Sequence, residues 1–89
     1  MPDPEASPLV FPCDFPLKVI GLRTDDFAQT MVGIVLRHAP DFGPETAKMR
    51  VSAGGRYLSL TCVIRARSRE QLNALYRELT AHPAVKVVL

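Results

Sequence analysis

The side chains that could take part in catalysis do not form a recognisable active site in the sequence. A catalytic site needs a nucleophile beside a base, a pair of carboxylates, or metal ligands at workable spacing. His38 and His82 both fall at expected helix ends, far apart in the chain. Cys62 falls on the inward face of an expected hairpin, where a thiol behaves as a small hydrophobic group. We therefore expect no catalytic residue, no metal ligand and no cofactor, and a protein that is not an enzyme.

The histidines and cysteines have structural interpretations instead. His38 is expected to interact with the last carbonyl groups of its own helix. Two cysteines without a C-x-x-C pattern indicate neither a disulfide framework nor a zinc site. Cys13 stands at the approach to the first expected strand, which is predicted to lie antiparallel to the strand of Cys62, and this places the two thiols too far apart for a disulfide.

Basic residues are placed in a way that is typical of an anion-binding surface. No aspartate or glutamate falls inside any expected strand, so a net charge of only +2 can hide a basic face of the sheet. Tyr57, Ser59 and Thr61 add hydrogen-bonding groups to the middle of this face. Its expected basic residues are Lys18, Lys48, Arg50, Arg65, Arg67 and Lys86.

Two interpretations of this basic face stay open. Either it binds an anion or a nucleic acid, or its lysines and arginines keep an uncovered sheet solvated and protect its edges. Single-stranded RNA is usually bound on a sheet by stacking aromatic side chains. Here the segment from Gly55 to Ser59 offers only Tyr57, so its likeness to an RNA-recognition signature is weak.

A β-hairpin over residues 47–66 positions most of these basic side chains. Gly54 and Gly55 lie between two strand-like runs and suit a two-residue type I′ turn, which needs positive φ at both central positions. The resulting register makes one face apolar and the other polar, and a slip by one residue would destroy that separation. The expected pairs on the apolar face are Ala53 with Arg56, Val51 with Leu58, Met49 with Leu60 and Ala47 with Cys62.

Two further strands and two helices flank this hairpin. Ser68 with Gln71 matches a capping box, and Ala39-Pro40 ends the first helix because the residue before proline avoids helical angles. The order predicts an α+β, ferredoxin-like two-layer sandwich, β-α-β-β-α-β, with an antiparallel four-stranded sheet, both helices on one face, and the first and third strands central. The expected elements are a strand over Phe15 to Leu22, a helix from Thr24 or Asp25 to about His38, a helix from Ser68 to His82 that buries Leu72, Leu75, Tyr76 and Leu79, and a strand over Val85 to Leu89.

Length and composition predict one cytoplasmic domain. Residues 1–10 are rich in proline and acidic side chains and are expected to form a disordered tail, which leaves 11–89 as the domain. No apolar run approaches the roughly 18 residues that span a bilayer, and the N-terminus lacks the basic and apolar segments of a signal peptide. We therefore expect no membrane partner.

Two apolar surfaces predict self-association or a protein partner. The stripe of the first helix is broader than contact with one sheet requires, and the last strand is a hydrophobic edge. Either Leu9 to Phe11 or a second subunit is expected to cover the remainder of the stripe. The stripe comprises Phe27, Met31, Ile34 and Val35, widened by Ala28, Val32 and Leu36.

A series of short segments carries a family resemblance. They are Phe11-Pro12, Phe15, Lys18-Val19 and Gly21, then Arg37-His38-Ala39-Pro40, then Tyr57, Ser59 and Thr61, then Leu75-Tyr76, Glu78-Leu79 and Val88-Leu89. In order and spacing they resemble the YbeD-like family of small bacterial proteins, over about Phe11 to Leu89. The resemblance implies a ferredoxin-like fold similar to ACT regulatory domains, without an established biochemical activity.

Similarity to ACT domains implies a candidate ligand loop at Gly21, Arg23, Thr24 and Asp25. The free amides of a helix N-terminus can receive a carboxylate there, assisted by Arg23. The sequence lacks the Asp-x-Pro-Gly-like turn of many amino-acid-binding ACT domains, and Asp25 and Asp26 would repel an anion. The sequence favours a regulatory or protein-interaction module that senses a small ligand or binds a partner protein. The alternative is weak RNA or anion binding through the basic face.

Overall fold

The computed structural model describes residues 10–89, so the expected disordered tail lies outside the described residues except for its last member, Val10. The elements follow the predicted order. They are β1 (Cys13–Leu22), α1 (Phe27–His38), a short 3₁₀ helix η1 (Pro44–Thr46), β2 (Lys48–Val51), β3 (Tyr57–Ala66), α2 (Arg69–Ala81) and β4 (Val85–Val88).

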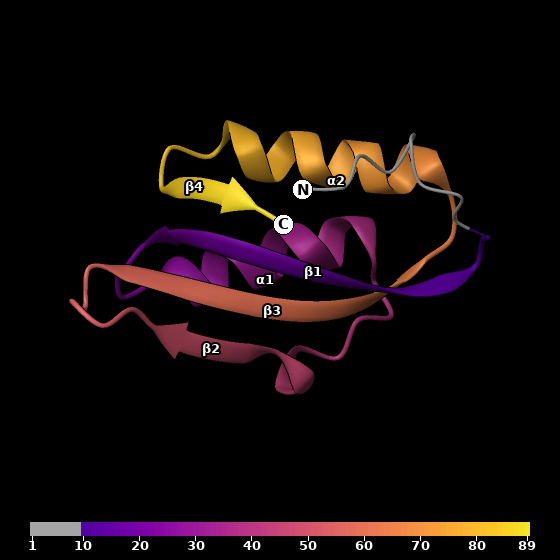
Figure 1. Cartoon of the computed structure of the whole chain (residues 1–89). Helices are drawn as coiled ribbons and strands as arrows, with labels where there is room; N and C mark the ends of the chain where they lie inside the picture. The colour runs from indigo at the N-terminus through magenta and orange to yellow at the C-terminus, as the bar shows by residue number, and fades with distance from the viewer. Residues whose placement is uncertain (1–9) are drawn as a thin grey trace.

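The four strands form one antiparallel sheet in the order β2-β3-β1-β4. The first and third strands are central, as predicted, and they run side by side over their whole length (Figure 1). Figure 1 also shows α1 behind the central strands, with β2 and β4 on opposite sides of them. The ferredoxin-like α+β sandwich is confirmed.

Alternation along the central strands explains which side of the sheet the helices cover. Leu17 and Val19 of β1 are buried, while Lys18 between them is exposed. Because successive strand residues point to opposite faces, β1 and β3 each give one apolar face to the core. The helices complete that core with Phe27, Met31, Ile34 and Val35 of α1 and Leu72, Leu75 and Leu79 of α2. Tyr76, which we expected in the second stripe, is 37% exposed.

The start of α2 is fixed by Ser68 and Gln71, as the capping box predicts. Ser68 Oγ accepts a hydrogen bond from Gln71 N at 3.1 Å. The Gln71 side chain does not return to Ser68: its Oε1 accepts from Arg67 N at 2.6 Å, and its Nε2 donates to the carbonyl of His38 at 2.8 Å. Gln71 therefore joins the beginning of α2 to the end of α1.

The start of α1 differs from the prediction of a cap at Thr24 or Asp25. The N-cap residue is Asp26, and its side chain makes no capping hydrogen bond. Thr24 Oγ1 donates to Asp26 Oδ1 at 2.9 Å, so these two polar groups are used on each other instead of on the helix amides.

The hairpin has the predicted register and a different turn. Val51 faces Leu58 as expected, but only Gly55 has a positive φ, of 74°. Gly55 N donates to Ser52 O at 2.9 Å, while Ser52 Oγ accepts from Tyr57 N at 3.1 Å. The Ser52 hydroxyl thus replaces the Ser52 carbonyl as the acceptor at the end of the ladder, and this carbonyl closes a turn over residues 52–55. The prediction of a two-residue type I′ turn was therefore wrong.

Strand lengths also differ from the expectation. The ladder between β2 and β3 includes only Lys48 to Val51, so the expected pair of Ala47 with Cys62 lies outside it. In contrast, β1 begins at Cys13, two residues early, which brings Asp14 into the sheet opposite Arg65. The expectation that no carboxylate lies in a strand was therefore wrong.

Gly21 allows an unusually close approach of β1 to its neighbours. A Cβ atom there would lie 2.3 Å from the carbonyl oxygen of Ala84 and 2.5 Å from Cε1 of Phe27. Phe11, Val32 and Leu36 are partly buried against the core, so Phe11 docks. Val10 is 79% exposed and Leu9 lies outside the described residues, so what covers the remainder of the α1 stripe stays a prediction.

Candidate binding surface on the open sheet face

The cross-strand register assembles three of the predicted basic residues on the sheet face away from the helices. Thr61 of β3 pairs with Lys18 on one side and with Lys48 on the other. Ser59, two residues away on the same face, likewise pairs with Arg50 of β2. Since neighbouring strands are about 4.8 Å apart, the long side chains of these cations can reach one anionic group above the two hydroxyls. We call Lys18, Lys48 and Arg50 the cation cluster.

Two shallow depressions lie over this part of the sheet. One, of about 250 Å³, is lined by the cation cluster together with Met49, Ser59 and Thr61. The other, of about 340 Å³, extends toward Ile20, Tyr57 and the end of β2. The candidate open-face residues are thus brought together, apart from Arg65.

Ion pairs divide the predicted basic residues into two groups. Within residues 10–89, no carboxylate pairs with a member of the cation cluster. Arg65 Nη1, in contrast, lies 3.2 Å from Asp14 Oδ1. Arg67 lies beyond the end of β3 and places Nη2 2.8 Å from Asp41 Oδ2. Three of the cations available to a ligand therefore lie together around Ser59 and Thr61 of β3.

An irregularity in β4 places Lys86 on the open face. The pairing of β1 with β4 shifts register between Ile20 and Gly21, which leaves Lys86 as an extra residue. Val85 and Val88 both pack on the core, so the two residues between them face away from it. Simple alternation also predicted Lys86 on the open face, although it did not predict the bulge.

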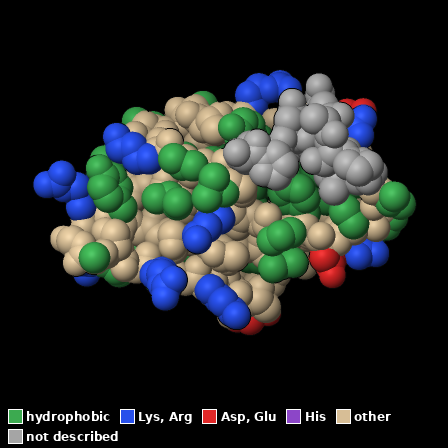
Figure 2. All heavy atoms as spheres, in the orientation of Figure 1, with side chains coloured by type: hydrophobic (Ala, Val, Ile, Leu, Met, Phe, Trp, Pro, Cys, Tyr) green, Lys and Arg blue, Asp and Glu red, His purple; other side chains and the backbone are tan. Residues whose placement is uncertain are grey.

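Apolar side chains occupy the remainder of the open face, and sequence reasoning did not identify them as a surface. Leu22 and Tyr57 are each 36% exposed, and Val87 and Leu89 are each 44% exposed. Figure 2 shows hydrophobic and basic side chains interspersed on this side of the molecule. We call Ile20, Leu22, Tyr57, Val87 and Leu89 the apolar patch. The apolar patch could have been predicted from two signals together, namely the alternation along β1 and the pairing of β1 with β4.

A second apolar feature borders β2 on the helix side. Met49 and Val51 face the same side of the sheet as buried Leu60 and Leu58, yet they are 60% and 45% exposed. A groove of about 240 Å³ runs beside Met49 and is lined mainly by Ala28, Val32, Pro44 and Ala47. The apolar face predicted for the hairpin is therefore covered along β3 and open along β2.

The candidate ligand loop is placed against the hairpin turn. Arg23 N donates to the carbonyl of Arg56 at 2.9 Å, and Arg23 Nη1 lies 3.4 Å from the carbonyl oxygen of Gly55. Gly21 is packed tightly, and Asp25 is exposed. Arg23 is thus engaged away from the start of α1, and ligand binding at Gly21 to Asp25 stays a prediction.

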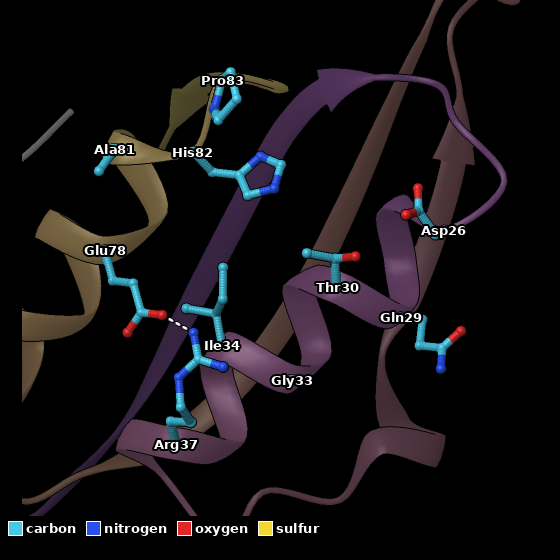
Figure 3. A pocket seen from close by; sticks show the side chains of 10 residues that line it. All are labelled: Asp26, Gln29, Thr30, Gly33, Ile34, Arg37, Glu78, Ala81, His82 and Pro83. Carbon is cyan, nitrogen blue, oxygen red and sulfur yellow. Dashed lines mark ion pairs between the residues drawn. The ribbon is translucent and has the colours of Figure 1, made fainter.

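A groove of about 700 Å³ separates α1 from α2, with Ile34 and Gly33 along it (Figure 3). At one end, Arg37 reaches across to Glu78 of α2 in an ion pair. The other carboxylate oxygen of Glu78 lies 2.7 Å from His38 Nε2. We expected the His38 ring to interact with the last carbonyl groups of α1, and this was wrong. The ring contacts Glu78 instead, and the carbonyl group of His38 accepts a hydrogen bond from Gln71 Nε2.

The thiols and histidines form no catalytic cluster in the described part of the chain. Cys62 is fully buried, and burial raises the pKa of its thiol from 9.0 to about 11, which disfavours the reactive thiolate. Cys13 is free and half-buried. His82 Nδ1 accepts from Ala84 N at 3.1 Å. Among residues 10–89 no three potential ligands gather as a metal site would require, and no helix there has the length and apolarity to cross a membrane.

Comparison with known proteins gives the family. The model of a protein family of unknown function, DUF493, matches residues 6–89. A UPF0250 protein of Ralstonia nicotianae is 56% identical over 97% of this chain and 89% of its own length, and one of Bordetella pertussis is 51% identical over 97% and 94%.

Solved structures support the fold at low sequence identity. The solution structure of HP0495 from H. pylori superposes with a TM-score of 0.74 at 15% identity, over 100% of this chain and 94% of that one. The ACT domain from GTP pyrophosphokinase of Chlorobium tepidum gives a TM-score of 0.64 at 15% identity, over 85% and 84%. The resemblance to YbeD-like proteins is confirmed, and the chain belongs to the DUF493 family.

Proposed function

We propose that this protein is a non-catalytic regulatory module that binds a partner protein through the open face of its sheet. The observation that supports this most is the apolar patch lying directly beside the cation cluster. An apolar centre with a charged rim is typical of protein contact surfaces, and exposed apolar patches on small domains commonly mark them. The ACT-like fold adds support by analogy of fold alone.

The charges indicate the chemistry of the partner. Stacking two copies face to face would bring Lys18, Lys48 and Arg50 of one copy near the same cations of the other, which is unfavourable. A partner that offers apolar side chains together with carboxylates complements both parts of the face. Self-association through α1 or β4, which the sequence predicts, avoids this repulsion and is compatible with partner binding on the open face.

A matched pair of tyrosine variants tests this function. Tyr57 on the open face and Tyr76 on α2 are 36% and 37% exposed, so Tyr57→Ala and Tyr76→Ala remove similar surface at different places. Proteins crosslinked to the tagged full chain in the native bacterium are quantified by mass spectrometry for each variant. The proposal predicts that Tyr57→Ala loses specific partners by about tenfold, as expected for a contact residue, and that Tyr76→Ala keeps them. Equal recovery by both variants would contradict it.

Single-stranded nucleic acid is a second candidate, favoured by Tyr57 beside unpaired cations. Fluorescence anisotropy with a short single-stranded RNA measures the affinity over a series of salt concentrations. Removing Lys48 and Arg50 together as alanines should flatten the slope of log affinity against log salt by about 1.4, because each phosphate contact contributes about 0.7. An unchanged slope, or the same change with Arg69 and Arg77 replaced on α2, removes this candidate.

A further inference from the structure

We propose that β2 is a docking strand for an extended acidic segment of the partner, which joins the sheet beside Lys48–Val51. This inference rests on the proposed function, because it names the kind of segment that the interaction module receives. It concerns the edge of the sheet, a surface separate from the apolar patch. Strand addition to a free edge is a general mode of peptide recognition, in which backbone hydrogen bonds give affinity and alternate side chains give specificity.

The backbone of β2 has hydrogen-bonding groups that point away from the sheet. Ser52 N donates to Tyr57 O at 2.9 Å, so these residues form a hydrogen-bonded pair of the antiparallel ladder. Such pairs alternate with pairs that exchange no backbone hydrogen bonds. Arg50 therefore bonds to β3, whereas the N–H and C=O groups of Met49 and Val51 point outward from the edge strand.

The side chains of β2 offer different chemistry on the two sides of this edge. Met49 and Val51 face the helix side of the sheet, and Met49 lines the apolar groove together with Ala28 and Val32. Lys48 and Arg50 lie on the open face and have no carboxylate partner among the described residues. Because side chains of an added strand also alternate, the matching segment carries apolar residues toward the groove and acidic residues toward the two cations.

A second copy of this chain fits the same edge poorly. Antiparallel pairing of β2 with β2 of another copy would place Lys48 and Arg50 beside the same residues on one face of the joined sheet. Like charges directly across a strand pair are destabilising. The charge of the edge therefore selects an acidic segment and disfavours its own duplicate.

The test is an amide NMR titration of the full chain with two synthetic peptides. One alternates valine with glutamate, and its control alternates valine with lysine. The acidic peptide should shift the Met49 and Val51 amides most strongly and saturably, while the basic peptide leaves them unchanged. Equal shifts with both peptides, or no shift of these amides at millimolar peptide, would overturn the proposal.

Two variants separate the backbone from the charges. Val51→Pro removes an outward N–H without removing a bond to β3, and should weaken binding of the acidic peptide by up to about tenfold, the value of one lost hydrogen bond. Reversal of Lys48 and Arg50 to glutamate should transfer the preference to the lysine peptide. Reversal of Arg69 and Arg77, two exposed arginines of α2, changes the net charge equally and should leave binding intact.

The same titration separates this inference from the proposed function. Shifts confined to Ile20, Tyr57 and Val87 would overturn docking at β2 and leave the open face as the binding surface. Shifts of Met49 and Val51 that depend on protein concentration without peptide, and that Val51→Pro abolishes, would identify a second copy as the occupant and overturn the acidic segment. If Val51→Pro does not fold, the charge-reversal variant decides.

Discussion

The two edge strands of the sheet have the same length and opposite environments. In β4, Val88 is 3% exposed and Val85 packs on the core, because α2 leads directly into this strand and contacts it. In β2, all four residues are exposed, and Met49 is 60% exposed although it faces the helix layer. The helices therefore close one side of the sandwich and leave the other open. The side chains of β4 contribute to the core, whereas those of β2 stay exposed.

The largest expected effect comes from a pair of glycines that differ in their surroundings. Gly21→Ala places a Cβ against Ala84 and Phe27, and should destabilise the fold by about 3 kcal/mol because backbone atoms must move. Gly33→Ala meets no atom within 4 Å and should stabilise α1 by up to about 1 kcal/mol. Chemical denaturation measures both. Equal losses would mean that Ala84 and Phe27 do not approach Gly21 as closely as described.

A valine in each edge strand gives the most direct stability comparison. Val88→Ala in β4 should cost about 2 kcal/mol, since it removes buried methyl groups and leaves a cavity. Val51→Ala in β2 should change the free energy of unfolding by less than about 0.5 kcal/mol, because its side chain is 45% exposed. Similar losses at both positions, measured by urea denaturation, would contradict the difference between the edges.

The helix that supports β4 should depend on its N-terminal cap. Ser68→Ala removes the acceptor of Gln71 N and should destabilise the protein by about 1 kcal/mol. Asp26→Ala at the start of α1 should have little effect, since that side chain makes no capping hydrogen bond. Thermal unfolding of both variants tests this; a larger loss from Asp26→Ala would contradict the assignment of the caps.

The smallest expected effect on stability comes from the thiol of Cys62, which is buried in the core on β3 and should matter only at alkaline pH. Unfolding lowers the pKa of this thiol from about 11 to 9.0, so its contribution to stability is complete below pH 9 and is lost as the pH rises toward 11. Cys62→Val should remove this part of the alkaline loss of stability.

At neutral pH a thiol reagent should label half-buried Cys13 quickly and Cys62 only through opening of the fold. Equally fast labelling of both would contradict a closed core.

Local sequence rules predicted the elements because each has an independent signal. Alternation marked β1 and β3, the pair of Ser68 and Gln71 marked the start of α2, and the glycines fixed the register of the hairpin. The turn was mispredicted because the hydroxyl of Ser52 took over a hydrogen bond that the backbone was expected to make. The cap of α1 was mispredicted because Thr24 and Asp26 bond to each other.

The candidate surface was predictable in part. Alternation and register were enough to place Lys18, Lys48 and Arg50 together with Ser59 and Thr61. The pairing of Arg65 with Asp14 was missed because β1 extends farther than its apolar pattern. The exposure of Met49 could not be predicted either, since periodicity gives the side of the sheet that a residue faces and not whether a helix reaches it.

Amide hydrogen exchange along β2 in the isolated protein tests our claim that this edge is free. The Arg50 amide, which bonds to β3, should be protected, while the outward amides of Met49 and Val51 should exchange nearly as fast as in an unfolded peptide. Protection of Met49 and Val51 equal to that of Arg50 would show that another strand already covers the edge, and would contradict the claim.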